Sequence, residues 1–367
     1  MRIALVYDRV NKWGGAERVL LALHEIFPDA PLYTAVYSSQ KAKWAKLFSK
    51  VIPSFLQKIP LTSTNHEFLG IFTPIAFEAF NFEEYDLVIS VTSEAAKGII
   101  TKPKTLHICY CLTPTRYLWS AHDFYFRNPP SKFKFIPHFW YLSRPFVKYL
   151  KYWDKIAAQR PDEYIAISSE VKKRIEKFYN RKSTIMFPPL MLSNVMPIKP
   201  KEKDYFLIVS RLVPYKKIDI AIKVFNELGF PLKIIGSGGE EKKLKKMANS
   251  NVEFLKNLSD EKLYGYYQNA KALIFPGVED FGLSMVEAQY FGKPVVAFRG
   301  GGALDIVKEG VTGEFFNEQS VKSLKNVLEK FDHKLYNEKS CSENSQNFSF
   351  EHFRQELLRF IEKQKTI

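Results

Sequence analysis

Short apolar runs alternate with amphipathic helical segments along almost the whole chain, and this alternation constrains the fold more than any other feature. Each run has the length of a β-strand and ends in a loop before the next helical pattern begins. The expected strands are residues 2–7, 32–36, 86–91, 105–110 and 164–167 in the first half, and 205–209, 232–235, 252–255, 272–275 and 295–298 in the second. Alternation at this spacing predicts an α/β fold with two parallel, doubly wound, Rossmann-like sheets.

The domain boundaries follow from length and composition. A chain of 367 residues exceeds one ordinary core, so two domains are expected. The segment from Phe187 to Asp204 is rich in proline and charge, which is typical of a hinge. We therefore expect a first domain over residues 1–187 and a second over 188–349. A terminal helix over residues 350–367 is expected to return to the first domain.

The composition indicates a globular protein with a basic first half. Hydrophobic residues make up 46% of the chain, which argues against disorder. Residues 1–182 carry 27 Lys and Arg against 16 Asp and Glu, whereas the remainder carries 27 against 23. A basic face could meet nucleic acid, anionic lipid or an anionic acceptor. A lysine-rich solvated surface would explain the excess equally well.

Membrane-spanning and secreted classes do not fit the sequence. No apolar run approaches the ~18 residues that a spanning helix needs. The start, MRIALVYDRV, is expected to be a first strand and not a signal peptide. Cys109, Cys111 and Cys341 have no metal-ligand spacing, and Cys109 and Cys111, which alternate within a strand-like run, are expected to be buried small hydrophobes. A reducing cytoplasm fits this sparse set of cysteines.

The stretch 116–153 interleaves aromatic side chains with lysine and arginine. Such pairs suit a membrane interface, and they also suit single-stranded nucleic acid. Packing of a helix on the sheet would explain most of the rings. Among partners, we expect an anionic inner-membrane surface, contacted at its cytoplasmic face, and no nucleic acid.

Two glutamates, Glu279 and Glu287, are separated by seven residues and lie around the start of an expected helix, 284–291. Glu279 follows a strand at its carboxyl end, where open α/β sheets bind ligands. Glu287 lies in an apolar setting, where a charge needs a partner. The backbone N–H groups of Phe281, Gly282 and Leu283 lie between the two carboxylates and suit a phosphate. The plainer alternative is that both acids only favour the helix dipole.

Other loops at strand ends are basic or rich in glycine. The guanidinium of Arg211 can donate two parallel hydrogen bonds to phosphate oxygens, and Lys216 adds a positive charge from the same loop. Gly14 and Gly15 follow the first strand and would let an anion approach the backbone, although a tight turn alone explains them. The segments Gly236-Ser237-Gly238-Gly239 and Gly300-Gly301-Gly302 follow two later strands. We expect these loops to converge on one cleft.

Several motifs resemble a known family. SRLVPYKKIDIAI, EDFGLSMVEAQYFGKPVVAFRGGGALDIV and NKWGGAERVL resemble the retaining glycosyltransferase family 4. HICYCLTPTRYLW and EYDLVISVTSEAAKG resemble its bacterial mannosyltransferase branch, which builds O-antigen and capsule. The resemblance implies the GT-B fold, with two Rossmann-like domains facing each other across a cleft and a C-terminal helix crossing back to the N-terminal domain.

The resemblance also implies roles for residues. Arg211 and Lys216 would bind the donor diphosphate, Glu279 the transferred sugar and Glu287 the ribose. The implied catalytic set is Glu279, Arg211 and Lys216, and the implied donor-binding set is Gly14, Gly15, Arg211, Lys216, Glu279, Phe281, Gly282, Leu283 and Glu287. No metal and no cofactor are implied, and the donor, a nucleotide sugar such as GDP-mannose, is a substrate.

The chain departs from the family pattern at two positions. Leu112 and Glu94 stand where related sequences have histidine, and leucine has no side-chain hydrogen bond to offer a sugar. The leading hypothesis is a cytoplasmic, membrane-associated retaining glycosyltransferase that moves a hexose, mannose from GDP-mannose, onto a lipid-linked saccharide acceptor in cell-surface polysaccharide synthesis. The alternatives are a non-catalytic sugar-nucleotide or glycan-binding partner in a biosynthetic complex and, on charge alone, a nucleic-acid-binding protein.

Overall fold

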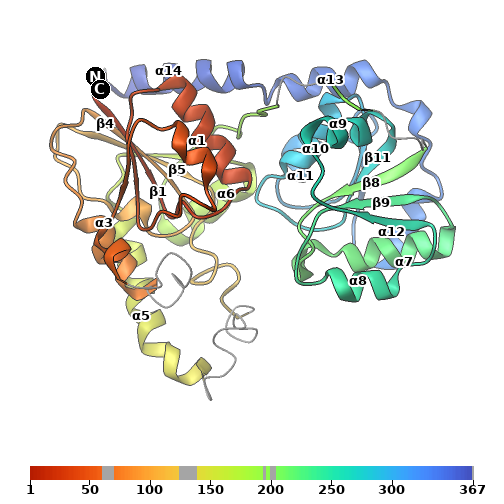
Figure 1. Ribbon diagram of the computed structural model, residues 1–367, viewed down its shortest axis with the longest axis horizontal. Coiled ribbons are helices and arrows are strands. Elements are labelled where there is room, and N and C mark those ends of the chain that lie inside the picture. Colours follow the sequence, from red (N-terminus) through yellow and green to blue (C-terminus); the bar gives the residue numbers. More distant parts are fainter. Residues whose placement is uncertain (60–69, 124–138, 193–195, 199–203, 366–367) are drawn as a thin grey trace. The chain divides into compact units, whose positions relative to one another are not determined.

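The computed structural model describes residues 1–59, 70–123, 139–192, 196–198 and 204–365. The chain divides into two compact units (Figure 1). Unit 1 contains Met1–Phe187 together with Glu356–Ile367, and unit 2 contains Pro188–Gln355. The terminal helix was expected to begin the return to the first domain at residue 350; residues 350–355 of this helix belong to unit 2 and the rest to unit 1.

Unit 1 is built on a seven-stranded parallel sheet with the order β3-β2-β1-β4-β5-β6-β7. Its strands are β1 (Ile3–Tyr7), β2 (Leu32–Thr34), β3 (Val51–Pro53), β4 (Leu87–Thr92), β5 (Leu106–Cys111), β6 (Glu163–Ala166) and β7 (Thr184–Ile185). The five strands expected from the sequence are confirmed, with small shifts at their ends. The outer strands β3 and β7 were not expected, because two or three residues are too few to form a recognisable pattern.

The helices of unit 1 pack around this sheet. They are α1 (Gly15–Ile26), α3 (Thr73–Glu78), α5 (Phe139–Ala157), α6 (Ser169–Tyr179) and most of α14 (Phe350–Lys365), with short 3₁₀ turns η1 (Lys43–Leu47), η2 (Phe55–Lys58) and η4 (Ala96–Gly98). As expected, Ser168 caps α6, and its hydroxyl accepts a hydrogen bond from the Val171 N–H at 3.1 Å. Helix α14 buries Phe353, Leu357 and Ile361, a spacing of four residues that places them on one face.

Unit 2 is built on a six-stranded parallel sheet with the order β10-β9-β8-β11-β12-β13. Its strands are β8 (Tyr205–Val209), β9 (Leu232–Ile235), β10 (Val252–Leu255), β11 (Ala270–Phe275), β12 (Val295–Phe298) and β13 (Gly313–Phe316). All five expected strands are confirmed. The additional strand β13 lies at the edge and begins at a glycine, which lowers strand propensity.

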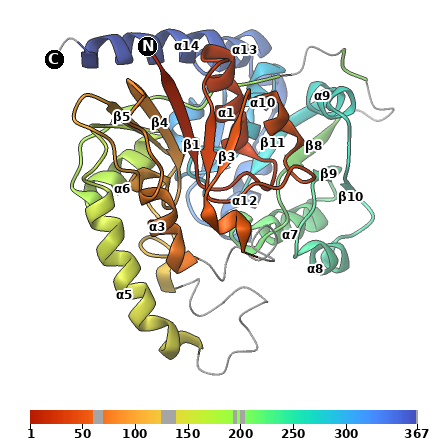
Figure 2. The ribbon, with the colours of Figure 1, turned by 60° about the vertical axis from the view of Figure 1, so that its left-hand side comes forward.

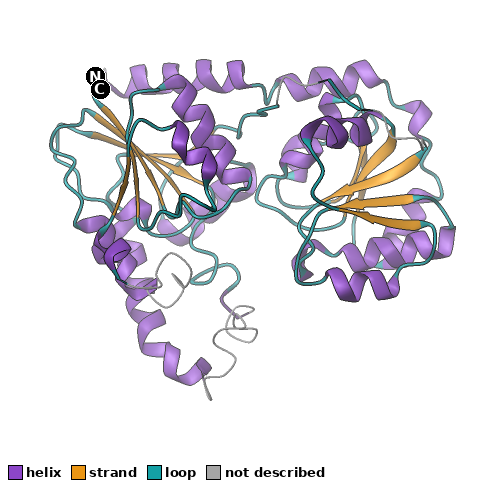
Figure 3. Cartoon of the chain, in the orientation of Figure 1, coloured by secondary structure: helices purple, strands orange, loops and turns teal. Residues whose placement is uncertain are grey.

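Helices cover both faces of the second sheet (Figure 3). They are α7 (Ile218–Leu228), α8 (Glu241–Met247), α9 (Asp260–Gln268), α10 (Leu283–Tyr290), α11 (Ala303–Ile306), α12 (Val321–Leu328) and α13 (Glu338–Gln346), with 3₁₀ turns η6 (Pro214–Lys216) and η7 (His333–Leu335). Helix α7 contacts α8 and α12, whereas α10 contacts α9, α11 and α13. Two Rossmann-like α/β units are therefore confirmed.

Each sheet has one point at which the strand order reverses. In unit 1 the reversal lies between β1 and β4, and in unit 2 it lies between β8 and β11. The connections from these neighbouring strands leave toward opposite sides of the sheet, which opens a crevice at their carboxyl ends. The loops after β1, β4, β8 and β11 are therefore the first places to look for a site. Among the described residues, no helix has the length and apolar character needed to cross a bilayer.

Candidate functional site

An ion pair joins the two loops at the reversal point of unit 2. Lys216 ends η6 in the loop after β8, and Glu279 lies in the loop after β11. The Lys216 ammonium contacts a carboxylate oxygen of Glu279. The Lys216 side chain is buried, whereas that of Glu279 is 24% exposed. The structure thus brings together two of the three residues that the sequence nominated for catalysis.

Close backbone contacts hold these loops in place. A Cβ on Gly277 would lie 2.8 Å from the Lys216 Cα, so the β11 loop can approach the β8 loop only through a glycine. Gly301, in the loop after β12, has φ +61°, and its Cβ would lie 2.2 Å from the Glu279 carbonyl oxygen. The Gly302 N–H also donates to that carbonyl at 2.9 Å.

The loop after β9 joins the same group. The Leu212 N–H donates to the Ser237 carbonyl at 2.9 Å, and the Glu240 N–H donates to the Leu212 carbonyl at 2.9 Å. The loops after β8, β9, β11 and β12 therefore converge at one edge of the second sheet, as expected for that unit. A separate hollow of about 770 Å³ lies among α9, α10 and α13, where its lining includes Tyr264 and Glu338 and not this ion pair.

Arg211 lies in the same loop as Lys216. It is exposed, and its Nη2 donates to the Tyr215 hydroxyl at 2.7 Å. The Lys216 ammonium lies 5.5 Å from the centre of the Tyr215 ring and 5.5 Å from that of Phe275, a distance typical of cation–π contact. Tyr215 therefore orders both cations of the loop.

The start of α10 lies between the two glutamates. The helix begins at Leu283, one residue before the expected start, and Gly282 precedes it with φ +110° and no side-chain cap. Phe281 is buried, and its ring centre lies 5.6 Å from that of Phe348. This aromatic contact fixes Phe281, two residues before the helix, and the first N–H groups of α10 have no side-chain cap from Gly282 to compete with an anion.

Glu287 is buried inside unit 2, and its partner is a phenol. Its Oε2 accepts a hydrogen bond from the hydroxyl of Tyr267, on α9, at 2.6 Å. Glu287 is 4% exposed and Tyr267 is fully buried. The expectation that this charge needs a partner is met, but nothing in the sequence indicated Tyr267, which lies 20 residues away.

The remaining nominated residues, Gly14 and Gly15, belong to unit 1. Gly14 precedes α1 and Gly15 is its first residue. A Cβ on Gly14 would lie 3.2 Å from a carboxylate oxygen of Glu17, which is itself buried and accepts a hydrogen bond from the Tyr7 hydroxyl at 2.6 Å. This packing is a structural reason for a small residue at the turn.

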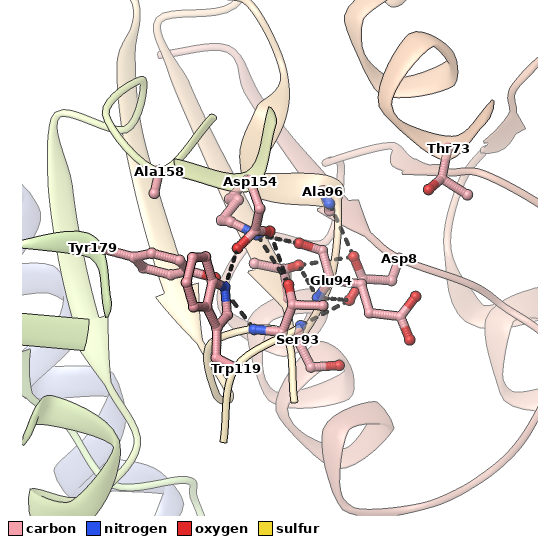
Figure 4. A network of polar contacts seen from close by, with 12 residues as sticks. Asp8, Thr73, Ser93, Glu94, Ala96, Trp119, Asp154, Ala158 and Tyr179 are labelled. Carbon is pink, nitrogen blue, oxygen red and sulfur yellow. Dashed lines mark hydrogen bonds and ion pairs between the residues drawn. The ribbon is translucent and has the colours of Figure 1, made fainter. Parts of the chain in front are cut away.

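Sequence reasoning missed a buried carboxylate at the reversal point of unit 1. Asp8 follows β1 and accepts hydrogen bonds from the loop after β4 (Figure 4). The donors are the Thr92 hydroxyl at 2.8 Å and the N–H groups of Ser93, Glu94 and Ala96 at 2.8, 3.1 and 2.9 Å. Burial, followed by repulsion from Glu94, raises the pKa of Asp8. Its position directly after a strand was the available signal.

Glu94, one of the two departures from the family pattern, is engaged by a neighbour of Asp8. Arg9 donates from Nη2 to a Glu94 carboxylate oxygen, and the two side chains are each 21% exposed. The second departure, Leu112, is half-buried, and its N–H donates to the Thr92 carbonyl at 2.8 Å. His107 lies within β5 and is fully buried, and its Nε2 lies 2.8 Å from the hydroxyl of Ser90, on β4.

A second buried carboxylate, Asp154 on α5, fixes the loop after β5 (Figure 4). One oxygen accepts hydrogen bonds from Lys97 Nζ at 2.6 Å and from the Thr115 hydroxyl at 2.9 Å, and the other accepts from Trp119 Nε1 at 2.7 Å. The side chains of Lys97 and Asp154 are each 2% exposed. Burial acts to lower the pKa of Lys97, but attraction to Asp154 outweighs it and the pKa is raised.

Comparison with known proteins finds a family model that matches unit 2 and solved structures with the same fold as the whole chain. Residues 196–348, nearly all of unit 2, match the family model described as glycosyl transferases group 1. The structure of Anabaena Alr3699/HepE in complex with UDP is similar to the chain with a TM-score of 0.72 and 19% identity, over 99% of this chain and 100% of that one. The fold of the chain is therefore GT-B.

Two curated relatives match part of the chain. An uncharacterized glycosyltransferase of Methanocaldococcus jannaschii is 25% identical over 204 residues, which cover 54% of this chain and 58% of that protein. The alpha-1,3/1,6-mannosyltransferase ALG2 of Dictyostelium discoideum is 30% identical over 212 residues, covering 48% and 49%. The chain therefore matches only about half the length of these curated relatives.

Proposed function

We propose that the protein is a retaining glycosyltransferase that moves a hexose from a nucleotide sugar onto a saccharide acceptor. The observation that carries this proposal is the Lys216–Glu279 pair at the strand-order reversal of unit 2. A cation and a carboxylate at this edge match the two ends of a nucleotide sugar, which has an anionic diphosphate and a polyhydroxylated ring. The match to glycosyl transferases group 1 covers the same unit.

In the proposed reaction, the bond between the anomeric carbon and the donor phosphate oxygen breaks, and a bond from an acceptor oxygen to that carbon forms on the same face. The acceptor's proton passes to the leaving phosphate. Lys216 and Arg211 stabilise the charge that develops on the leaving diphosphate, and the first N–H groups of α10 support the same phosphates. Glu279 holds hydroxyls of the transferred sugar, whose transition state is oxocarbenium-like. Glu287 holds the ribose.

We propose mannose as the sugar, GDP-mannose as the donor and a lipid-linked saccharide as the acceptor, in synthesis of an O-antigen or capsule at the cytoplasmic face of the inner membrane. The relative named as a mannosyltransferase supports the sugar. The HepE complex contains UDP, so donors with either base belong in the test.

The test is a screen of GDP- and UDP-sugars for transfer and for slow donor hydrolysis. Wild type is expected to turn over one donor, and Glu279→Ala and Lys216→Ala are expected to lose that turnover. Full activity in either variant contradicts the assignment of the site.

A second candidate is a sugar-nucleotide or glycan-binding partner without catalysis. Leu112 is apolar, and Arg9 pairs with Glu94, so both positions that depart from the family pattern offer less to a sugar than histidine would. Calorimetric binding of a nucleotide sugar with no turnover, across donors and acceptors, favours this candidate.

A further inference from the structure

Helix α5 has an apolar stripe on its solvent-facing side. Its members are aromatic or aliphatic side chains that are between 43% and 69% exposed: Tyr141, Leu142, Phe146, Tyr149, Tyr152 and Ile156. A helix of a water-soluble domain normally turns such residues toward the core. In two views the N-terminal half of α5 extends beyond the sheet of its own unit (Figures 1 and 2). The first three members of the stripe therefore belong to the half of α5 that extends beyond the sheet, and the other three continue along the second half of the helix.

A basic stripe runs beside the apolar one. Arg144, Lys148, Lys151 and Lys155 follow at spacings of four, three and four residues, which aligns them along one side of a helix. The only acidic residue in the α5 sequence is Asp154, and its carboxylate is buried with Lys97. All the formal charge on the solvent-facing side of α5 is therefore positive.

The opposite face of α5 holds the helix on unit 1. Leu150, Trp153 and Ala157 are buried there, and Trp153 Nε1 donates to the Glu78 carboxylate at 2.8 Å. Together with the hydrogen bonds of Asp154, these contacts anchor the helix without using the apolar stripe. Changes to the outward side chains thus leave the anchoring face intact.

We infer that the outward face of α5 docks on an anionic lipid surface, with the helix axis parallel to the membrane. The cations meet anionic headgroups, while the tyrosine rings lie at the headgroup level and the aliphatic groups enter the acyl boundary. The helix has 19 residues, so it offers a contact about 29 Å long. This inference gives the membrane location within the proposed function a defined surface, and it is independent of the donor chemistry.

Single-stranded nucleic acid is the competing partner for rings beside lysines, because bases stack on aromatic side chains. The stripe favours lipid, since Leu142 and Ile156 have no ring on which a base can stack, yet they enter an apolar phase readily.

Sedimentation of the full chain with vesicles tests the inference. Wild type is expected to bind vesicles of phosphatidylcholine mixed with phosphatidylglycerol, to bind pure phosphatidylcholine weakly, and to lose affinity as salt rises. Arg144→Gln/Lys148→Gln/Lys155→Gln is expected to weaken binding on the order of 100-fold, since each cation near the surface contributes roughly fivefold. Tyr149→Ser/Tyr152→Ser/Ile156→Ser is expected to weaken it further by removing the apolar contact.

The matched control is Lys41→Gln/Lys46→Gln/Lys50→Gln, which removes the same charge from another exposed part of unit 1 and is expected to bind almost as wild type does. Thermal unfolding of every variant checks that the fold is intact. Equal binding by the α5 variants and the control overturns the inference, as does oligonucleotide binding by this face without vesicle binding. Because donor hydrolysis is measured without vesicles, failure of docking and failure of the proposed sugar transfer are separate results.

Discussion

The two strand-order reversals of the molecule are built with different chemistry. In unit 2 the loops pack backbone against backbone through glycines, and the charged pair Lys216–Glu279 lies between them with Glu279 partly exposed. In unit 1 the loops are held by charged side chains that are themselves buried, namely Asp8 and the Lys97–Asp154 pair.

The comparison distinguishes charged side chains that stabilise the fold from charged side chains that are placed to bind a ligand. A fully buried charge needs several hydrogen bonds to offset its desolvation, and Asp8 and Asp154 each receive three or more. Glycine packing uses no charged group, so the Glu279 carboxylate stays partly exposed beside the buried Lys216. Substitutions of buried charges in unit 1 are therefore expected to affect stability, whereas those of the unit 2 pair are expected to affect activity.

The largest expected effect is on stability in unit 1. Asp154→Ala leaves Lys97 buried without its counter-ion and removes the acceptor for Thr115 and Trp119. We expect a loss of about 3–5 kcal/mol in the free energy of unfolding, measured by urea denaturation. Glu83→Ala is the control, because its partner Lys102 is 49% exposed and such surface pairs contribute less than about 1 kcal/mol. Equal losses in the two variants would remove the contrast between the units.

Lys216→Ala tests the other side of the comparison. Loss of one cation that stabilises a leaving group is expected to lower kcat for donor turnover by about 10²–10³-fold. Unfolding should change little, because the remaining Glu279 carboxylate reaches water. Lys223→Ala, an exposed position on α7, is the matched control and is expected to keep full turnover. A variant that unfolds readily but retains turnover when folded would place Lys216 with the structural charges of unit 1.

The pH dependence of stability sharpens the comparison for unit 1. Burial, followed by repulsion from Arg181 and Arg160, lowers the pKa of His107 from 6.5 to about 3. Below pH 6.5 His107 is protonated in the unfolded chain but stays neutral in the folded chain. The free energy of unfolding therefore falls as the pH falls toward 3. The loss is about 2 kcal/mol between pH 6.5 and about pH 5.

His107→Gln keeps a hydrogen-bonding group for Ser90 but cannot titrate. Urea denaturation of both proteins at the two pH values should therefore show a steeper decline for wild type. Parallel declines would mean that His107 does not contribute to the pH dependence.

The smallest expected effect concerns glycine packing in unit 2. Gly301 and Gly310 both have positive φ, +61° and +72°, but only at Gly301 would a Cβ meet another backbone, that of Glu279. Alanine is strained at either position, and at Gly301 it must also displace the β11 loop. We expect Gly301→Ala to be destabilised by about 1 kcal/mol more than Gly310→Ala and to lose donor turnover, which Gly310→Ala should retain. Identical behaviour in unfolding and turnover assays would show that the loops do not depend on this contact.

The sequence allowed the central strands of both sheets to be predicted because each is a buried apolar run between loop signals. The short edge strands β3, β7 and β13 were not predicted, because hydrogen bonding to a neighbouring strand defines them and their sequences carry no recognisable apolar pattern. The positions of Arg211, Lys216 and Glu279 were predictable for a similar reason, since parallel strands bring loops to one edge of a sheet.

The buried charges could not be predicted in the same way. Lysine and aspartate are mostly exposed in proteins, and Lys97 and Asp154 are 57 residues apart. Only the tertiary fold brings them together, as it does Glu287 and Tyr267. Similarly, the fold shows that the lysines of α5 align beside an exposed apolar stripe, whereas the sequence indicated only that rings and cations are interleaved.

The most direct test of the donor site is a calorimetric titration of GDP-mannose and UDP-sugars into wild type, Lys216→Ala and Asp154→Ala, each at a temperature where the protein is folded. The predicted result is that wild type and Asp154→Ala bind the same nucleotide sugar, while Lys216→Ala binds it at least tenfold more weakly, about 1.4 kcal/mol. Undiminished binding by Lys216→Ala, or no binding of any nucleotide sugar by wild type, would contradict the placement of the donor at the strand-order reversal of unit 2.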